Sequence, residues 1–231
     1  MGLAAAKRFV QEGMGHVFIT GRRKDAPDRA VAEVGRNVTA VQGDVANLTD
    51  LDHLYDEVQK QNRRIDVLFA NAGVAQLAPL NSVDEKLYDL HFDANVKGMF
   101  LTVQKALPLM NDSGAIILTG SIADVKGFPS ASVYSATKAA IRSFARTWTN
   151  ELKDRRIRVN TIGPGHIDTP IFDAWQQGDT LTKRVTWPES SFTSMAASLK
   201  SDEEHRCPSK QSLRLSVQNP WQTSHRRFVT P

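Results

Sequence analysis

A tyrosine and a lysine four residues apart are the side chains whose types and spacing best suit acid-base chemistry in this sequence. They bound the segment Tyr134-Ser-Ala-Thr-Lys138, and Ser121 precedes them. Because residues four apart share one face of a helix, the Lys138 ammonium can lie beside the Tyr134 phenol. A unit positive charge about 4 Å away is worth roughly 4 kcal/mol at an effective dielectric near 20, which would lower the phenol pKa by about three units at most. The spacing therefore predicts a phenol that exchanges a proton with a carbinol near neutral pH, with Ser121 able to hydrogen-bond the same substrate oxygen.

An alternative interpretation is that Tyr134 and Lys138 are surface residues of an amphipathic helix. The choice between the two interpretations depends on the elements around the pair. Apolar runs predict strands at 16–20, 38–41, 65–70, 115–119 and 157–162. Helical periodicity predicts helices near 1–10, 24–35, 48–62, 90–110 and 132–153. Strands that are apolar on both faces and joined by helices indicate an α/β fold, a Rossmann-like doubly wound parallel sheet.

Glycines and polar residues follow these predicted strands. They are Gly21-Arg22, Gly43-Asp44, Asn71-Ala72-Gly73, Ser121 and Pro164-Gly165. In a doubly wound sheet, ligands bind at the carboxyl ends of the strands. The sequence therefore predicts a binding site at that edge of the sheet.

The order of these segments resembles the short-chain dehydrogenase/reductase family. The resemblance rests on Asn71-Ala72-Gly73, Asn95, Ser121, Tyr134-Ser-Ala-Thr-Lys138 and Asn160-Thr-Ile-Gly-Pro164-Gly165-His-Ile-Asp-Thr169, and covers roughly residues 2–175. It implies hydride transfer between a nicotinamide cofactor and an alcohol or carbonyl substrate. Tyr134 would be the general acid/base, Lys138 would lower its pKa and hold the nicotinamide ribose, Ser121 would orient the substrate, and Asn95 would hold a proton-relay water through its helix backbone.

The resemblance also implies cofactor contacts along the strand ends. Asn71, Ala72 and Gly73 would flank the cofactor, Asp44 and Val45 would meet the adenine, and Ile167 and Thr169 would meet the nicotinamide carboxamide. The full set of expected cofactor-binding residues is Gly2, Gly21, Arg22, Arg23, Asp44, Val45, Asn71, Ala72, Gly73, Tyr134, Lys138, Pro164, Gly165, Ile167 and Thr169.

The segment after the predicted strand at 16–20 bears on the choice between NAD and NADP. NAD-dependent relatives commonly place an acidic residue there, which accepts a hydrogen bond from the ribose 2′-hydroxyl. This chain has Gly21, which removes side-chain bulk, followed by Arg22 and Arg23, whose forked donors suit a 2′-phosphate. We therefore expect NADP in preference to NAD. The alternative is that both arginines are solvated turn residues.

Both ends of the sequence differ from the family pattern. Family members open with a strand and the turn T-G-x-x-x-G-I-G, of which Gly2 would be the last glycine, so we expect a sheet that lacks the first strand and binds cofactor weakly or not at all. In the strand order 3-2-1-4-5-6 that strand has a neighbour on each side. All 14 glycines lie at or before Gly178, and the family's last strand is not recognisable beyond it. We expect a partial domain over 1–178 and a disordered or out-of-frame tail over 179–231.

Composition favours a cytoplasmic protein without metal or nucleic acid. The hydrophobic share is 41%, and no apolar run is long enough to span a membrane. The formal net charge is only +4, without the basic cluster expected of a nucleic-acid binder. A single cysteine excludes internal disulfides. His91 and His166 lack partners at metal-ligand spacing and are interpreted as structural. The resemblance implies self-association through the helices at 90–110 and 132–153. A catalytically inactive relative that acts by association with intact homologues remains the alternative to an enzyme, and the sequence does not indicate the substrate.

Overall fold

The computed structural model describes residues 1–61, 63–165 and 167, and it has the predicted alternation of strands and helices. The strands are β1 (Val17–Gly21), β2 (Val38–Gln42), β3 (Ile65–Ala70), β4 (Met110–Thr119) and β5 (Arg158–Ile162). The helices are α1 (Gly2–Gln11), α2 (Ala26–Val34), α3 (Leu48–Lys60), α4 (Glu85–His91), α5 (Gly98–Ala106) and α6 (Ser132–Glu151). Short helical segments are η1 (Leu80–Ser82), η2 (Phe92–Lys97), η3 (Leu107–Leu109), η4 (Ile122–Asp124) and η5 (Lys153–Arg155). The expected tail over 179–231 lies outside the described residues.

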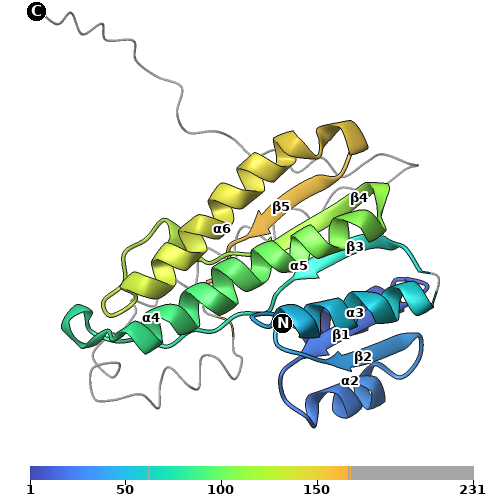
Figure 1. Ribbon diagram of the computed structural model, residues 1–231, viewed down its shortest axis with the longest axis horizontal. Coiled ribbons are helices and arrows are strands. Elements are labelled where there is room, and N and C mark those ends of the chain that lie inside the picture. The colour runs from blue at the N-terminus through green and yellow to red at the C-terminus, as the bar shows by residue number, and fades with distance from the viewer. Residues whose placement is uncertain (62, 166, 168–231) are drawn as a thin grey trace, which may run out of the picture. The chain divides into compact units, whose positions relative to one another are not determined.

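The strands form two parallel sheets, β1-β2 and β3-β4-β5 (Figure 1). The parallel pairing and the intervening helices confirm the Rossmann-like α/β class. Among the described residues, β1 pairs only with β2 and β3 pairs only with β4. The open edges of β1 and β3 are those that the sequence analysis predicted for a sheet lacking the family's first strand.

One predicted helix, at 90–110, is wrong in its limits and its winding. Helical structure begins earlier, at Glu85, because the Asp84 side chain accepts the Leu87 N–H at 2.8 Å and so caps α4. The next segment, η2, is a π-helix, and regular α-helix resumes only at Gly98. Strand β4 then begins at Met110, five residues ahead of its predicted start at 115. Apolar periodicity did not separate these segments because each of them keeps one buried face.

The main core lies between the strands and helices α3, α5 and α6, which lie next to one another in Figure 1. Its most buried apolar side chains are Leu51 of α3, Val103 of α5, Ile116 and Leu118 of β4, and Ile141 of α6. Each is worth roughly 1.5–3 kcal/mol when fully buried. This core fixes α6 against β4 and β5, and α6 carries the tyrosine and lysine singled out above.

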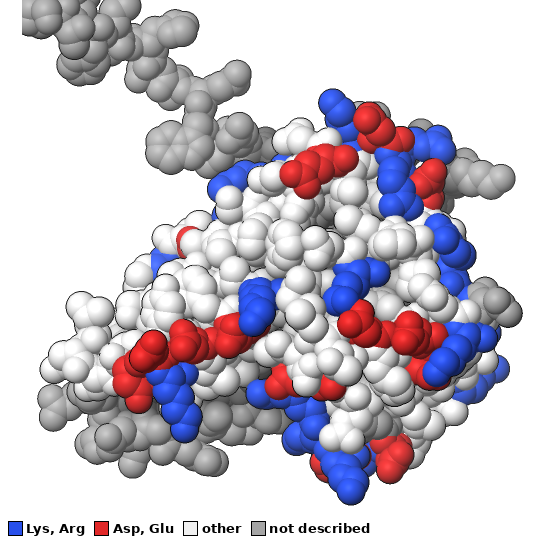
Figure 2. All heavy atoms as spheres, viewed as in Figure 1, with Lys and Arg blue, Asp and Glu red and all other residues white. Residues whose placement is uncertain are grey.

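The described surface in Figure 2 mixes acidic and basic side chains over the face viewed in Figure 1. Several acidic and basic side chains of the described residues form ion pairs, among them Lys97 with Asp93 at 3.3 Å and Lys60 with Glu57 at 2.7 Å. Among the described residues, no helix is both long and apolar enough to cross a membrane.

Candidate active site

Tyr134 and Lys138 lie in the first two turns of α6, as the sequence predicted. The Lys138 side chain is buried, with 4% of its surface exposed, and its Nζ lies 5.6 Å from the centre of the Tyr134 ring. Nζ donates a hydrogen bond to the Thr119 carbonyl at the end of β4, at 2.9 Å. The tertiary structure therefore places the ammonium over the phenol ring and ties it to the neighbouring strand.

The predicted lowering of the Tyr134 pKa is wrong for the structure as described. Burial raises the pKa of Tyr134, a hydrogen bond with the Ser121 side chain opposes that rise, and the negative charge of Asp124 adds to it. Burial also lowers the pKa of Lys138 to about 8. The estimate from spacing took account of the lysine's charge but not of the desolvation of both groups, which acts in the opposite direction on the phenol.

Ser121 begins the short helix η4 directly after β4, and 8% of its surface is exposed. Its Oγ accepts the Ala123 N–H at 3.1 Å, which fixes the turn. The chain on either side is held by β5 and the loop after it, because Gly120 N–H donates to the Ile162 carbonyl at 2.8 Å and Ile122 N–H to the Pro164 carbonyl at 3.1 Å. These bonds bring the serine to the tyrosine as predicted.

Asn95 is fully buried in the π-helix η2 and holds the chain that follows β3. Its Oδ1 accepts the Val74 N–H at 2.8 Å, and its Nδ2 donates to the Val74 carbonyl at 2.9 Å and to Thr137 Oγ1 at 3.1 Å. A side chain at Gly73 would come within 2.9 Å of Oδ1. Asn95 therefore joins the loop after β3 to α6, and its proposed relay water stays a prediction.

His91 holds the same loop one turn earlier. Its ring is fully buried, Nε2 accepts the Gln76 N–H at 3.0 Å, and Nδ1 lies 2.9 Å from the Leu87 carbonyl. Both ring nitrogens are thus used, which agrees with the structural interpretation of this residue. His166 lies outside the described residues.

The residues expected at the adenosine end gather where β1 and β2 end. Arg22 and Arg23 are exposed, and the Arg22 guanidinium lies 3.8 Å from the Asp44 carboxylate. Gly21 has open space where a side chain would project. Asp44 is held by its own N–H, which donates to Asp50 Oδ2 at 2.8 Å.

The contact of Val45 with adenine stays a prediction. The Val45 side chain is buried, with 8% of the surface exposed, and a side chain at Gly98 of α5 would come within 3.0 Å of Val45 Cγ2. Val45 is part of the main core, so only its backbone is available to a ligand.

The N-terminus of α1 lies beside the end of β3. A side chain at Gly2 would come within 3.0 Å of Asn71 Nδ2, and Asn71 Oδ1 lies 3.4 Å from Thr119 Oγ1. Ala72 is exposed and Gly73 half-buried in the loop that follows. Residues Gly2, Asn71, Ala72 and Gly73 therefore share the edge of the sheet that also carries the lysine and the serine.

The last group of expected contacts follows β5. Pro164 and Gly165 are half-buried, and the Pro164 carbonyl accepts a hydrogen bond from the Ile122 N–H of η4. Ile167 is 41% exposed. Thr169 lies outside the described residues.

Three residues that sequence reasoning missed complete the site. Thr119 offers its carbonyl to Lys138, Thr137 contacts Asn95, and Asp124 contacts Arg142 of α6 through two hydrogen bonds. Arg142, the partner of Asp124, is a fourth missed residue, and it alone left a signal in the sequence, because it continues the series of residues four apart that begins at Tyr134.

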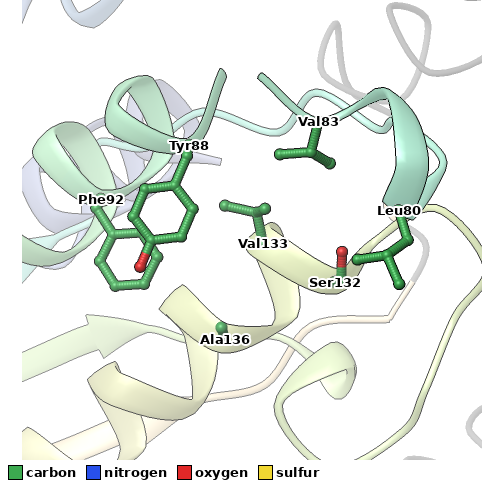
Figure 3. Close-up of a pocket in the computed structure, with 7 residues that line it drawn as sticks. All are labelled: Leu80, Val83, Tyr88, Phe92, Ser132, Val133 and Ala136. Carbon is green, nitrogen blue, oxygen red and sulfur yellow. The ribbon is translucent and has the colours of Figure 1, made fainter. Parts of the chain in front are cut away.

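An apolar hollow of about 420 Å³ lies nearby but on another face of α6 (Figure 3). Its lining residues are Leu80, Val83, Tyr88, Phe92, Ser132, Val133 and Ala136. At 3.6 residues per turn, Val133 and Ala136 project to the side of α6 that faces away from Tyr134. This hollow is therefore separate from the acid-base pair.

A family model, curated relatives and solved structures all relate this chain to short chain dehydrogenases and other oxidoreductases. The family model described as short chain dehydrogenase matches residues 1–180. Oxidoreductase asL5 of Sarocladium schorii is 47% identical over 173 residues, which are 74% of this chain and 69% of that protein. The 3-oxoacyl-(acyl-carrier-protein) reductase FabG of Thermotoga maritima is 35% identical over 176 residues, 74% of this chain and 71% of that protein. A short chain dehydrogenase from Burkholderia cenocepacia, solved in complex with NADP, superposes with a TM-score of 0.68 at 29% identity, over 74% of this chain and 72% of that one.

Proposed function

The chain belongs to the short chain dehydrogenase family, and from this we propose that it is an NADP-dependent oxidoreductase that interconverts a carbonyl and an alcohol. The observation that carries the proposal is the convergence of Ser121, Tyr134 and Lys138 at the carboxyl end of β4. A phenol held between a hydroxyl and a buried ammonium is suited to pass a proton to or from a substrate oxygen. The reductases among the relatives support the carbonyl as the substrate group.

The residues at this edge fit a nicotinamide dinucleotide, which supplies hydride when bound. The first turn of α1 has no acidic residue and no side-chain cap, so its free N–H groups and the positive end of the helix favour a diphosphate. Glycine at position 73 keeps the chain close to Asn95 and Lys138, where a side chain would lie 3.7 Å from Nζ. Lys138 would hold the nicotinamide ribose, and Asn71 and Gly73 would border it.

In the proposed reduction, Ser121 donates a hydrogen bond to the substrate carbonyl oxygen and Tyr134 delivers a proton to it. Lys138 favours the phenolate that remains, because its ammonium lies over the same ring. Asn95 and His91 keep the loop after β3 in place beside these groups. In the oxidation of an alcohol, the same residues act in reverse.

NADP is favoured over NAD by Arg22. Its side chain is 54% exposed and follows the end of β1, next to the open space at Gly21. Asp44 at 3.8 Å holds the guanidinium in this region. The NADP complex of the Burkholderia cenocepacia relative supports the same preference.

Turnover of NADPH tests the proposal. The purified chain is mixed with NADPH and a panel of an acetoacetyl thioester, a cyclic aryl ketone and a short aliphatic aldehyde, and cofactor absorbance is followed. We expect consumption that depends on one of these carbonyls and falls at least about a hundredfold in Tyr134→Phe. Tyr88→Phe, which removes the hydroxyl of an exposed tyrosine, serves as the matched control. Turnover that is equal in the wild type and Tyr134→Phe would contradict the assigned role of the tyrosine.

We further infer that two copies associate through α5 and α6. Phe100 of α5 is 37% exposed and packs beside Phe144 and Trp148 of α6, with ring centres 5.7 and 5.9 Å away. Light scattering of the protein as it elutes from a size-exclusion column should show a dimer for the wild type and a monomer for Phe100→Asp. Leu48→Asp, a change at an exposed leucine of α3, should leave the dimer intact. Association without NADPH turnover would favour the inactive alternative, in which the chain acts through intact homologues.

A further inference from the structure

The end of β4 and the short segment that follows it are attached to α6 at three points. Lys138 donates to the Thr119 carbonyl, Tyr134 shares a hydrogen bond with Ser121, and Arg142 pairs with Asp124. The three helix residues are spaced four apart, so they form one row along the face of α6. Two of these attachments belong to the proposed catalytic group. The third has no part in the reaction as described so far.

The third attachment is a two-point ion pair. Arg142 Nε lies 2.6 Å from Asp124 Oδ2, and Arg142 Nη2 lies 2.8 Å from Oδ1. The Asp124 side chain is completely buried, whereas 44% of the Arg142 side chain is exposed. A buried carboxylate is costly unless it is paired, and a guanidinium that uses both oxygens also fixes the orientation of the carboxylate.

The pair lies on the same turn as the serine. Asp124 N–H donates to the Ser121 carbonyl at 3.1 Å, so the carboxylate and the serine share one turn of backbone. Any shift of Asp124 along α6 must therefore move Ser121 relative to Tyr134. Among the described residues, Arg142 is the side chain that forms an ion pair with Asp124, whereas Lys138 senses its charge without a direct bond.

We propose that the Asp124–Arg142 pair is a positioning device, which holds the Ser121 hydroxyl at Tyr134 and neutralises the charge that Asp124 would otherwise place beside the acid-base pair. The effect of the pair on catalysis rests on the proposed function, whereas its effect on the ionisation of Tyr134 does not. The residues are argued to act through Ser121 and Tyr134, and neither of them contacts the substrate.

The charges around Tyr134 define what each substitution should do. The charged or titratable groups around it are Lys138 on the same helix, Asp124 on η4, and His91 of α4, whose ring centre lies 6.4 Å away. Arg142 pairs with Asp124 and so acts on Tyr134 through that carboxylate. Asp124 raises the pKa of Tyr134 through its negative charge. Removing Arg142 alone leaves that charge uncompensated, whereas removing the Asp124 charge abolishes it.

The first measurement is the ionisation of Tyr134, which requires no activity. The chain has three tyrosines, so near-ultraviolet absorbance of each variant is recorded against pH and the curve of the same variant carrying Tyr134→Phe is subtracted. We expect Arg142→Met to move the Tyr134 midpoint to higher pH and Asp124→Asn to move it to lower pH. Arg146→Met, one turn further along α6 and exposed, should leave it unchanged.

The second measurement is the pH profile of NADPH turnover with the best carbonyl of the panel. Arg142→Met should lower kcat by about tenfold to a hundredfold with little change in the KM for NADPH, because misplacement of a reacting group by about 1 Å costs this much. Arg142→Lys, which keeps the charge but not the two-point geometry, should recover part of the loss. Adding Asp124→Asn to Arg142→Met should restore the pH profile, because the buried charge is then gone.

The outcomes separate this inference from the proposed function. Opposite midpoint shifts in Arg142→Met and Asp124→Asn, without turnover in the wild type, would support the pair and overturn the oxidoreductase proposal. The opposite result is a Tyr134 midpoint that does not move in either variant, together with turnover in Arg142→Met that falls only in proportion to the loss of folded protein. It would show that the ion pair is purely structural and would overturn the inference. Circular dichroism of each variant gives the folded fraction used in that comparison.

Discussion

Replacing Lys138 with methionine should stabilise the folded chain while it removes activity. Lys138 is buried, with 4% of its surface exposed, and within the described residues its ammonium donates one hydrogen bond, to the Thr119 carbonyl. Methionine has a similar length and no charge, so it fills the same space without the cost of burying an ion. Such a conflict between stability and activity is common at functional sites.

The size of the effect follows from the pKa of the lysine. Burial lowers the pKa of Lys138 from its ordinary 10.5 to about 8. At about 1.4 kcal/mol for each pKa unit, the charged form costs the folded state roughly 3 kcal/mol at pH 7. The variant leaves the Thr119 carbonyl without its donor, which costs about 1 kcal/mol. We therefore expect Lys138→Met to raise the free energy of unfolding by about 2 kcal/mol at pH 7.

The pH dependence gives the prediction a sign that can be checked. Between pH 8 and 10.5 the unfolded lysine keeps its proton and the folded lysine loses it, so the wild type gains stability from this residue as the pH rises. The advantage of the variant should therefore shrink over this range, because the cost of burying the charge has disappeared at its upper end. Lys126→Met, at an exposed lysine, is the matched control and should show no such trend.

Urea unfolding of the wild type and both variants at several pH values between 7 and 10.5 measures these differences. The reasoning would be refuted if Lys138→Met were no more stable than the wild type at pH 7. A stability difference that stayed constant with pH would refute it equally, because the gain would then have another origin.

Three further substitutions test the contacts that hold the site. Tyr55→Phe removes a buried hydroxyl that donates to a backbone carbonyl at 2.6 Å, and urea unfolding should show a loss of about 1 kcal/mol. His91→Leu leaves the Gln76 N–H without an acceptor and should speed its hydrogen exchange at least about tenfold. His91→Gln offers an amide oxygen to the same N–H and should retain part of the protection. Equal exchange of the Gln76 N–H in the two variants would argue against the contact. Arg155→Ala removes hydrogen bonds to the Leu107 carbonyl of η3 at 2.8 Å and to the Met110 carbonyl at the start of β4 at 2.7 Å, and should lower Tm by about 2–6 °C. An unchanged melting curve would show that these bonds add nothing to stability.

The strands and the acid-base pair were predictable because they depend on local pattern. Strand β3 has the predicted limits, 65–70, and Tyr134 and Lys138 share the helical face that their spacing required. That β1 and β3 each pair with a single strand among the described residues was also predicted, since the order 3-2-1-4-5-6 places the family's first strand between them. These features need only periodicity and the order of elements along the chain.

The electrostatics of the site were not predictable from spacing. The pKa of Tyr134 depends on burial by elements distant in sequence, and the carbonyl that accepts from Lys138 lies at the end of strand β4 rather than on α6. Asp124 and Arg142 are 18 residues apart, and nothing in either local sequence pairs them. The π-helix η2 escaped prediction because its residues fit an ordinary helical pattern until the packing of Asn95 is known.

The central claim is that this edge of the sheet binds a phosphorylated nicotinamide dinucleotide, and a fluorescence titration tests it most directly. The chain and Arg22→Ala are titrated with NADPH and NADH, with Arg36→Ala, at an exposed arginine outside the site, as control. We predict saturable binding of NADPH that is tighter than that of NADH, and a loss of about tenfold or more in NADPH affinity in Arg22→Ala alone, as expected for a charge-assisted contact. Absence of saturable binding of either cofactor would contradict the account, and equal affinity for both would contradict the role assigned to Arg22.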